Sequence, residues 1–200
     1  RKSIEQFGKN VLLVYGGGSI KRNGIYDEVY KLLEGFNIHE LSGVEPNPRI
    51  ETVRRGVEIC KKEKIDVVLA AGGGSAIDCA KVVAAGAYYD GDSWDIVLDP
   101  HKICKVLPIV TILTLAATGS EMNKNAVISD MSSNDKIGTG HWNMIPKVSI
   151  LDPTYMYTLP PIQTAAGTAD IMSHIIENYF KREKEAFVQD RIAEGLLEAC

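Results

Sequence analysis

The chain contains 200 residues, of which 45% are hydrophobic and 24% are charged, a composition that is ordinary for a folded globular protein. The formal net charge of -4 provides no general attraction for nucleic acid, so we expect no nucleic-acid partner. No apolar run reaches the roughly 18 residues that a membrane span needs, and residues 1–30 lack the pattern of a signal peptide. We therefore expect a cytoplasmic protein with no membrane partner. The cysteines form no C-x-x-C pair, which favours reduced thiols that serve in packing.

Two segments share one pattern, a short apolar run followed by glycines and then by apolar residues at helical spacing. Residues 11–15 lead into a glycine-rich turn at 16–19, and residues 67–71 lead into a second turn at 72–75. Each pattern predicts a strand, a tight turn and a helix. Two such units predict parallel strands joined by crossover helices, as in α/β proteins.

The later elements continue this order and then become helical. Pro108 stands near the start of a predicted strand at 106–113, and the pair Pro160 and Pro161 suits the beginning of a helix. The other predicted elements are a helix at 50–62, a hairpin of strands 125–130 and 136–140, a strand at 148–151 and a last helix from about residue 185. We predict an α/β nucleotide-type domain over residues 1–152 and the start of an all-helical domain over 153–200, within a longer protein.

The glycine turns permit two interpretations. Backbone N–H groups in such a turn approach a phosphate closely, and the partial positive charge of the helix N-terminus adds to the attraction. Alternatively, each turn is a tight connection whose serine, Ser19 or Ser75, caps the helix. Neither turn satisfies G-x-G-x-x-G, because Lys21 and Ile77 stand at the last glycine position, and neither is a P-loop. Asp78 either closes a capping box with Ser75 or lies beside a ligand.

Asp170 and His174 are four residues apart in the helix predicted after Pro160 and Pro161, so their side chains project from one face of that helix. Both side chains are ligands that divalent metals accept. The spacing equally fits a solvated polar pair, and Glu177 is interpreted as a solvated or structural residue on the same face. The pair is therefore half of a metal site or an ordinary polar face.

Residues 72–81, GGGSAIDCAK, resemble the GGGSxxDxxK element of the iron-containing (group III) alcohol dehydrogenases. The segments LDP at 151–153, LPP at 159–161 and AGTAD at 166–170, followed by His174, resemble a second signature of that family. The matches keep the family's order and spacing over essentially the whole chain.

The resemblance implies a dehydroquinate synthase-like fold, in which a Rossmann-like dinucleotide-binding domain precedes a helical domain and the active site lies between them. It also implies a divalent metal held by one aspartate and three histidines. Asp170 and His174 match the first two ligands, and the other two are expected after Cys200. Fe(II) is favoured by the resemblance, although these ligand types also suit zinc or another divalent metal. The remaining histidines are expected to be surface or loop residues: His39, His101 and His141.

The expected cofactor-binding residues are carried over from the family by position. The second glycine turn is expected at the pyrophosphate, and residues 155–159 are expected beside the nicotinamide. A simple turn at Asn47 and a solvated Lys136 are the alternatives for those two positions. No catalytic residue beyond the metal ligands is predicted. The matching positions are Gly17, Gly18, Ser19, Asn47, Gly72, Gly73, Gly74, Ser75, Asp78, Thr114, Thr118, Asn123, Lys136, Tyr155, Thr158 and Leu159.

The cofactor preference is predicted from the first glycine turn. YGGGSIK at residues 15–21 and YMYTLPP at 155–161 resemble the family's NADPH-dependent butanol dehydrogenase and aldehyde reductase branch. Relatives that prefer NAD tend to carry an acidic residue in this turn, and this chain has none there. The turn leaves room for a 2′-phosphate, and Lys21 or Arg22 can supply positive charge. NADP(H) is therefore expected in preference to NAD(H), with a solvated Lys21-Arg22 pair as the alternative.

The expected reaction is a reversible hydride transfer between NADP(H) and a small-molecule primary alcohol or aldehyde at the metal. A glycerol or polyol dehydrogenase-like enzyme, or a lyase related to dehydroquinate synthase, is the alternative within the fold. A different alternative is that the 200-residue chain is a nucleotide-binding fragment without catalysis. A homodimer is the default expectation for such enzymes.

Overall fold

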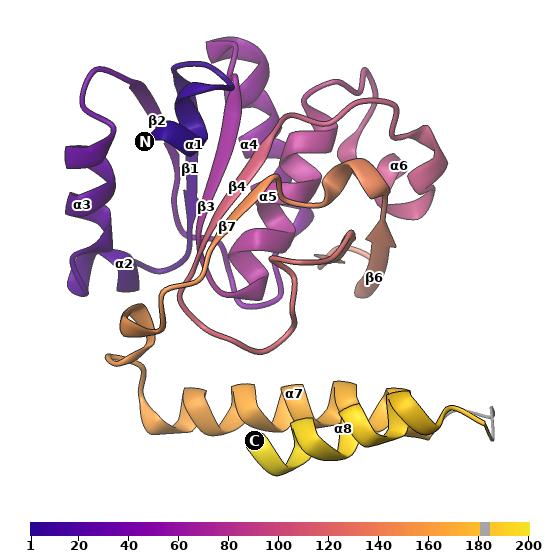
Figure 1. Ribbon diagram of the computed structural model, residues 1–200. Coiled ribbons are helices and arrows are strands. Elements are labelled where there is room, and N and C mark those ends of the chain that lie inside the picture. Colours follow the sequence, from indigo (N-terminus) through magenta and orange to yellow (C-terminus); the bar gives the residue numbers. More distant parts are fainter. Residues whose placement is uncertain (181–184) are drawn as a thin grey trace.

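The computed structural model describes residues 1–180 and 185–200. Its centre is a five-stranded sheet in which the strands lie in the order β2-β1-β3-β4-β7 and every neighbouring pair is parallel (Figure 1). A separate hairpin pairs β5 antiparallel with β6. The strands are β1 (Asn10–Tyr15), β2 (Asn37–Leu41), β3 (Val67–Gly72), β4 (Ile109–Leu113), β5 (Asn125–Asp130), β6 (Asp135–Gly140) and β7 (Val148–Ile150).

Helices cover both faces of the sheet, and two further helices lie beyond its end (Figure 1). α7 and α8 run side by side there, below the sheet in this view. The α-helices are α1 (Lys2–Glu5), α2 (Ser19–Arg22), α3 (Ile25–Leu32), α4 (Ile50–Glu63), α5 (Gly74–Gly86), α6 (Ser93–Leu98), α7 (Pro161–Tyr179) and α8 (Phe187–Ala199). Short 3₁₀ helices occur at Pro100–Lys102, Trp142–Met144 and Pro153–Met156.

The strands divide their side chains between two cores. In β1, Leu12 and Val14 pack with α4 and α5, whereas Val11 and Leu13 pack with α2 and α3 on the other face. This alternation follows from the two-residue repeat of a strand. Every residue of β3 is buried, as expected for a central parallel strand covered on both faces. Because β1, β3 and β4 are parallel neighbours, their carboxyl ends lie together at one end of the sheet, and the turns that follow these strands lie there too.

The predicted α/β class is confirmed, as are the helix from residue 50, the hairpin, and the helix that begins after Pro160. Pro161 is the first residue of α7, where the missing N–H removes no helical hydrogen bond. Within residues 1–180 and 185–200, we find no helix with the length and apolar character that a membrane crossing requires. The division into domains at residue 152 stays a prediction.

Some boundaries differ from the predicted ones. Edge strand β2 was not predicted, because its sequence NIHEL is largely polar and β2 pairs only with β1. The helix after the first glycine turn is split into α2 and α3, since Gly24 adopts a left-handed conformation with φ 83°. β4 begins at Ile109, directly after Pro108, which lacks an N–H for the ladder. The last helix begins at Phe187.

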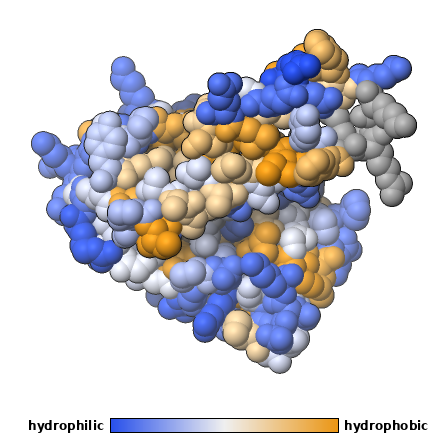
Figure 2. Space-filling model, turned by 90° about the horizontal axis from the view of Figure 1, so that it is seen from below, coloured by the Kyte–Doolittle hydropathy of each residue, from blue (hydrophilic) through white to orange (hydrophobic). Residues whose placement is uncertain are grey.

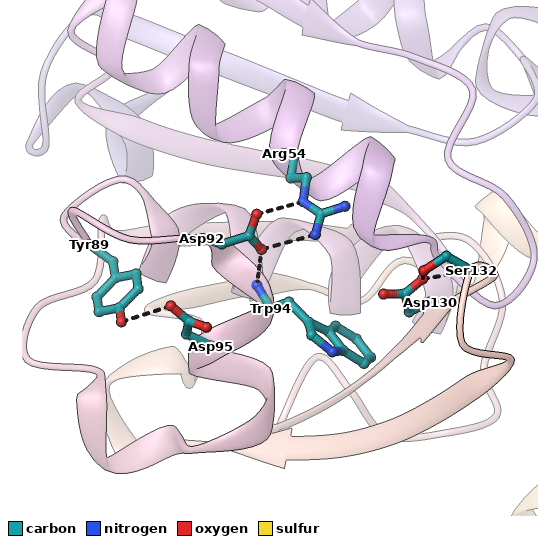
Figure 3. A network of polar contacts seen from close by, with 7 residues as sticks. All are labelled: Arg54, Tyr89, Asp92, Trp94, Asp95, Asp130 and Ser132. Atoms are coloured by element: carbon teal, nitrogen blue, oxygen red, sulfur yellow. Dashed lines mark hydrogen bonds and ion pairs between the residues drawn. The ribbon is translucent and has the colours of Figure 1, made fainter.

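Polar contacts join α4 to the beginning of α6, and a separate contact between Asp130 and Ser132 lies beside them (Figure 3). The Arg54 guanidinium of α4 donates two hydrogen bonds, of 2.9 and 3.1 Å, to the Asp92 carboxylate. Asp92 also caps α6 by accepting a 2.7 Å bond from the Trp94 N–H. These contacts lower the pKa of Asp92, the hydrogen bond from Arg54 most of all. Thr139 of β6 donates to the Ile96 carbonyl at 3.2 Å, so α6 connects α4 to the hairpin.

We expect Asp92→Ala to lower the free energy of unfolding by about 1–2 kcal/mol, because it removes both the cap and the ion pair. Asp92→Asn keeps a capping oxygen and loses the charge, so its loss should stay below about 1 kcal/mol. Urea unfolding of both variants in the full-length protein measures this difference. Equal losses in the two variants would show that the cap contributes nothing.

Candidate functional site

The turns after β1, β3 and β4 meet at the carboxyl edge of the sheet, where open α/β folds bind their ligands. A hollow of about 220 Å³ joins the first turn to the segment before α7. Its lining brings together five of the predicted cofactor residues, and arginine, asparagine and proline side chains complete the wall. The lining residues are Ser19, Arg22, Asn23, Thr114, Tyr155, Thr158, Leu159 and Pro160.

The first glycine turn begins a helix without a serine cap. Gly18 is the N-cap of α2 and adopts a left-handed conformation with φ 94°, and no side chain caps this helix. Ser19 is therefore the first residue inside the helix, and its interpretation as an N-cap was wrong. Glycine takes this position because a Cβ disfavours positive φ. The turn presents the backbone of Gly17 and Gly18 to the edge of the sheet, as a phosphate cradle requires.

The second glycine turn is tightly packed against the loop that follows β4. Gly73 is the N-cap of α5, again without a side-chain cap, so the capping interpretation of Ser75 was also wrong. A Cβ on Gly74 would lie 2.5 Å from the Thr118 Oγ1 atom. A Cβ on Gly72 would lie 2.7 Å from the Ala76 Cβ. Glycine at these positions therefore allows the turn, the helix and the loop to approach closely.

Asp78 is held by the loop after β4 and does not form a capping box. Its carboxylate accepts hydrogen bonds from the Ser120 hydroxyl at 2.5 Å and from the Val127 N–H at 2.9 Å. Burial raises the pKa of Asp78, against these hydrogen bonds and the charge of Lys81, which favour the ionised form. Asp78 thus lies one turn inside α5, directed at the loop beside the glycine turn.

Lys81 is completely buried and holds the same loop. Its ammonium donates to the Asn123 carbonyl at 2.8 Å, to the Asn125 carbonyl at 2.7 Å and to the Ser120 hydroxyl at 3.0 Å. Burial lowers the pKa of Lys81 to about 8, although Asp78 and Glu121 favour its charged form. The sequence signal for this role is a lysine within the largely apolar helix α5. Lys81 is also the last residue of the family element at 72–81.

Asn123 uses its side-chain oxygen within the loop. Its Oδ1 atom accepts from the Lys81 ammonium at 3.1 Å and from the Asn125 N–H at 2.9 Å. The Oδ1 atom is therefore engaged within the loop, and the predicted place of Asn123 in the cofactor groove stays a prediction.

Asn47 and Lys136 are 89 positions apart in the sequence and in contact in the fold. The Lys136 ammonium donates a 2.8 Å hydrogen bond to the Asn47 Oδ1 atom. A backbone bond of 2.9 Å from the Ser129 N–H to the Pro48 carbonyl holds the hairpin against this turn. Asn47 has a φ of 58°, a conformation that asparagine tolerates better than most residues. The turn and the hairpin lysine thus form one polar surface.

Asp170 and His174 lie together on α7. The Asp170 Oδ2 atom is buried and accepts no hydrogen bond in the part of the chain that the structure describes, and it lies 3.7 Å from the His174 Nε2 atom. Two atoms that bind one metal at about 2.1 Å can be at most about 4 Å apart, so this pair fits a shared metal ion. The His174 Nδ1 atom lies 3.8 Å from the Glu177 carboxylate, which can hold the ring in position.

No group of three or more potential ligands among His, Cys, Asp and Glu occurs in residues 1–180 and 185–200. The described residues thus supply two ligand atoms at this position. Of the remaining histidines, His101 is exposed, His39 lies on strand β2, and His141 precedes a 3₁₀ helix.

α7 touches the loop after β4 through a glycine. A Cβ on Gly167 would lie 2.6 Å from the Ala116 carbonyl oxygen, so the helix that carries Asp170 and His174 rests directly on the loop backbone. Next to this contact, a hollow of about 570 Å³ lies between residues 117–119 and the two helices, with His174 on its wall. Isoleucine and leucine side chains supply much of the lining, and Figure 2 shows apolar side chains gathered along α7 and α8.

A parallel sheet with glycine turns at its carboxyl ends is typical of dinucleotide-binding α/β proteins, and the Asp–His pair on α7 adds a candidate metal position. A sequence model described as "Iron-containing alcohol dehydrogenase" matches residues 1–153. The chain belongs to the iron-containing alcohol dehydrogenase family.

Individual relatives agree with this family. The chain is 63% identical over 201 aligned residues to NADH-dependent butanol dehydrogenase A of Clostridium acetobutylicum, covering 100% of this chain and 52% of that protein. It is 43% identical over 190 residues to the NADPH-dependent aldehyde reductase YqhD of Escherichia coli, covering 94% and 49%. The crystal structure of an NADH-dependent butanol dehydrogenase A from Thermotoga maritima superimposes with a TM-score of 0.93 at 47% identity, covering 98% and 50%. The chain spans about half the length of the curated relatives it matches.

We expect Gly167→Ala to lower the free energy of unfolding by about 1–3 kcal/mol, because the new methyl group overlaps the Ala116 carbonyl and forces α7 away from the loop. Gly195→Ala in α8 is the matched control, since nothing lies within 4 Å of an added Cβ there. That control should leave stability unchanged or raise it by up to about 1 kcal/mol. Thermal unfolding of both full-length variants measures the difference, and equal midpoints would contradict the close contact at Gly167.

Proposed function

We propose that the whole protein transfers a hydride reversibly between a nicotinamide dinucleotide and a primary alcohol or aldehyde at a divalent metal. The observation that carries this proposal is the buried, unbonded Asp170 oxygen, 3.7 Å from the His174 Nε2 atom. This pair lies on the helix that rests on the loop after β4, which in turn contacts the second glycine turn. The names of the butanol dehydrogenase and aldehyde reductase relatives support the substrate class.

Different segments of the described chain would bind different parts of the cofactor and substrate. The backbone of residues 72–75 would bind the pyrophosphate with the N-terminus of α5, and Thr114 and Thr118 would line the adjoining groove. Tyr155, Thr158 and Leu159 would lie beside the nicotinamide and exclude water from one side of it. A bound metal would supply Lewis acidity toward the alcohol or aldehyde oxygen. The apolar wall beside His174 suits the alkyl chain of such a substrate.

Fe(II) is the metal that we propose, with zinc or another divalent metal as the alternative. The name of the family supports iron. One carboxylate and one imidazole do not discriminate among these metals by chemistry alone. Asp170 and His174 would be two of its ligands.

NADP(H) is the cofactor that we propose in preference to NAD(H). The first glycine turn carries no carboxylate, and the Lys21 ammonium lies beside it, 5.4 and 4.4 Å from the ring centroids of Tyr15 and Tyr26. The names of the relatives divide: butanol dehydrogenase A is NADH-dependent, and YqhD is NADPH-dependent. The proposal therefore depends on the charge beside the turn, which a substitution can test.

We further propose a cytoplasmic enzyme that assembles as a homodimer, with its dinucleotide domain ending near residue 152. A polyol dehydrogenase-like activity in the same fold remains the second candidate, and assays with butanal, glycerol and methylglyoxal separate the two.

We expect His174→Ala in the full-length protein to lose bound metal and to reduce kcat/KM for butanal on the order of 100-fold, since an imidazole ligand is removed. The exposed His101 provides a matched control, and His101→Ala should keep both metal and activity. Metal content by mass spectrometry and NAD(P)H oxidation are the two measurements. Normal metal content and activity in His174→Ala would refute the metal site.

We expect Lys21→Met to lower kcat/KM for NADPH about tenfold while changing that for NADH less than about twofold, because only NADPH carries the 2′-phosphate. Lys31 of α3 is also exposed, and Lys31→Met serves as the control for loss of one surface charge. Steady-state kinetics with both dinucleotides give the ratio. Equal effects on the two cofactors would remove Lys21 from the choice between them.

A further inference from the structure

We propose that Lys81 is a positioning residue for the dinucleotide, which fixes the loop at residues 114–125 so that Thr118 stands against the second glycine turn. This inference rests on the proposed function. It assigns a role to a buried charged group that neither the metal pair nor the glycine turns use directly.

The hydrogen bonds of Lys81 all run to one short stretch of the loop. Its acceptors are the carbonyls of Asn123 and Asn125, the Asn123 side chain and the Ser120 hydroxyl, at 2.7 to 3.1 Å. An ammonium group has three N–H donors, and these backbone and side-chain oxygens can occupy all of them. The loop is therefore fastened to α5 at its far end by directional bonds.

The near end of the loop touches the beginning of the same helix. The Thr118 Oγ1 atom lies 2.5 Å from the position that a Cβ on Gly74 would occupy. Lys81 stands seven residues further along α5, about 10 Å along the helix axis. Two separated contacts with one rigid helix fix both the position and the direction of the loop. Asp78 strengthens this connection between them, because it binds the Ser120 hydroxyl and the Val127 N–H.

The chemistry of the contact excludes a purely apolar packing role for Lys81. Burying an ammonium is unfavourable unless oxygen acceptors surround it. An apolar residue of similar length would fill the space but leave the part-buried Asn123 and Asn125 carbonyls without this donor, which is unfavourable where water does not replace it. The loop is thus held in a conformation that directs its carbonyls toward α5 and its Thr118 side chain toward the glycine turn.

The test compares the full-length wild type with Lys81→Met, which keeps the length of the side chain and removes the charge. We expect the Kd for NADPH or NADH to rise about tenfold while kcat at saturation changes less than about twofold, because the chemistry is left intact once the cofactor is bound. We also expect faster amide hydrogen exchange in residues 118–127. Lys31→Met is the control for loss of one lysine charge and should change neither quantity.

The outcomes separate this inference from the proposed function. A wild-type protein that binds neither NADPH nor NADH overturns the proposed function itself. Wild-type binding with an unchanged Kd in Lys81→Met overturns only the role of Lys81. If Lys81→Met does not fold, Ser120→Ala decides, since it removes a partner of both Lys81 and Asp78. A Kd raised about threefold or more with kcat retained supports the inference, and an unchanged Kd contradicts it.

Discussion

The close approach of the loop at residues 114–125 to two glycines is the constraint on which the candidate site depends. A Cβ on Gly74 would lie 2.5 Å from Thr118 Oγ1, and a Cβ on Gly167 would lie 2.6 Å from the Ala116 carbonyl oxygen. The first glycine begins α5 at the proposed pyrophosphate turn, and the second lies in α7, about one turn before Asp170 and two turns before His174. The loop lies between the beginning of α5 and α7, so it sets the distance between the proposed pyrophosphate turn and the candidate metal ligands. A side chain larger than that of glycine at residue 74 or 167 would increase this distance.

Buried charge holds the same loop in place. The Ser120 hydroxyl accepts a hydrogen bond from the Lys81 ammonium and donates one to the Asp78 carboxylate, so this hydroxyl connects the two charged groups. Burial disfavours the charged form of each, and each charge favours the ionisation of the other. Removing either group would leave the other buried with fewer partners, which costs more than the pair contributes when intact. This mutual dependence explains why both sit on an otherwise apolar helix.

The sequence could predict what depends on short-range pattern. Strand, glycine turn and helix repeat in order, and Pro161 was correctly expected to open a helix. It could not predict the caps, since Gly18 and Gly73 occupy the N-cap positions that one of the two interpretations assigned to serine. It also could not place Asn47 against Lys136, which are 89 positions apart and meet only through the packing of the hairpin. Edge strand β2 escaped prediction because one-sided pairing leaves room for polar residues.

The same edge strand bears on the choice of cofactor. The hydroxyls of Tyr15, Tyr26 and Tyr30 all donate to the Glu40 carboxylate of β2, immediately behind the first glycine turn. Partial burial opposes ionisation of Glu40, but these hydrogen bonds outweigh it and lower its pKa. A carboxylate that already accepts three hydrogen bonds is a source of negative charge with little capacity left to accept from ribose hydroxyls. Lys21 lies over the rings of Tyr15 and Tyr26, so its attraction for the 2′-phosphate of the proposed cofactor would act against the field of Glu40. Under the proposed function, the preference between NADP(H) and NAD(H) would depend on the balance of these two charges.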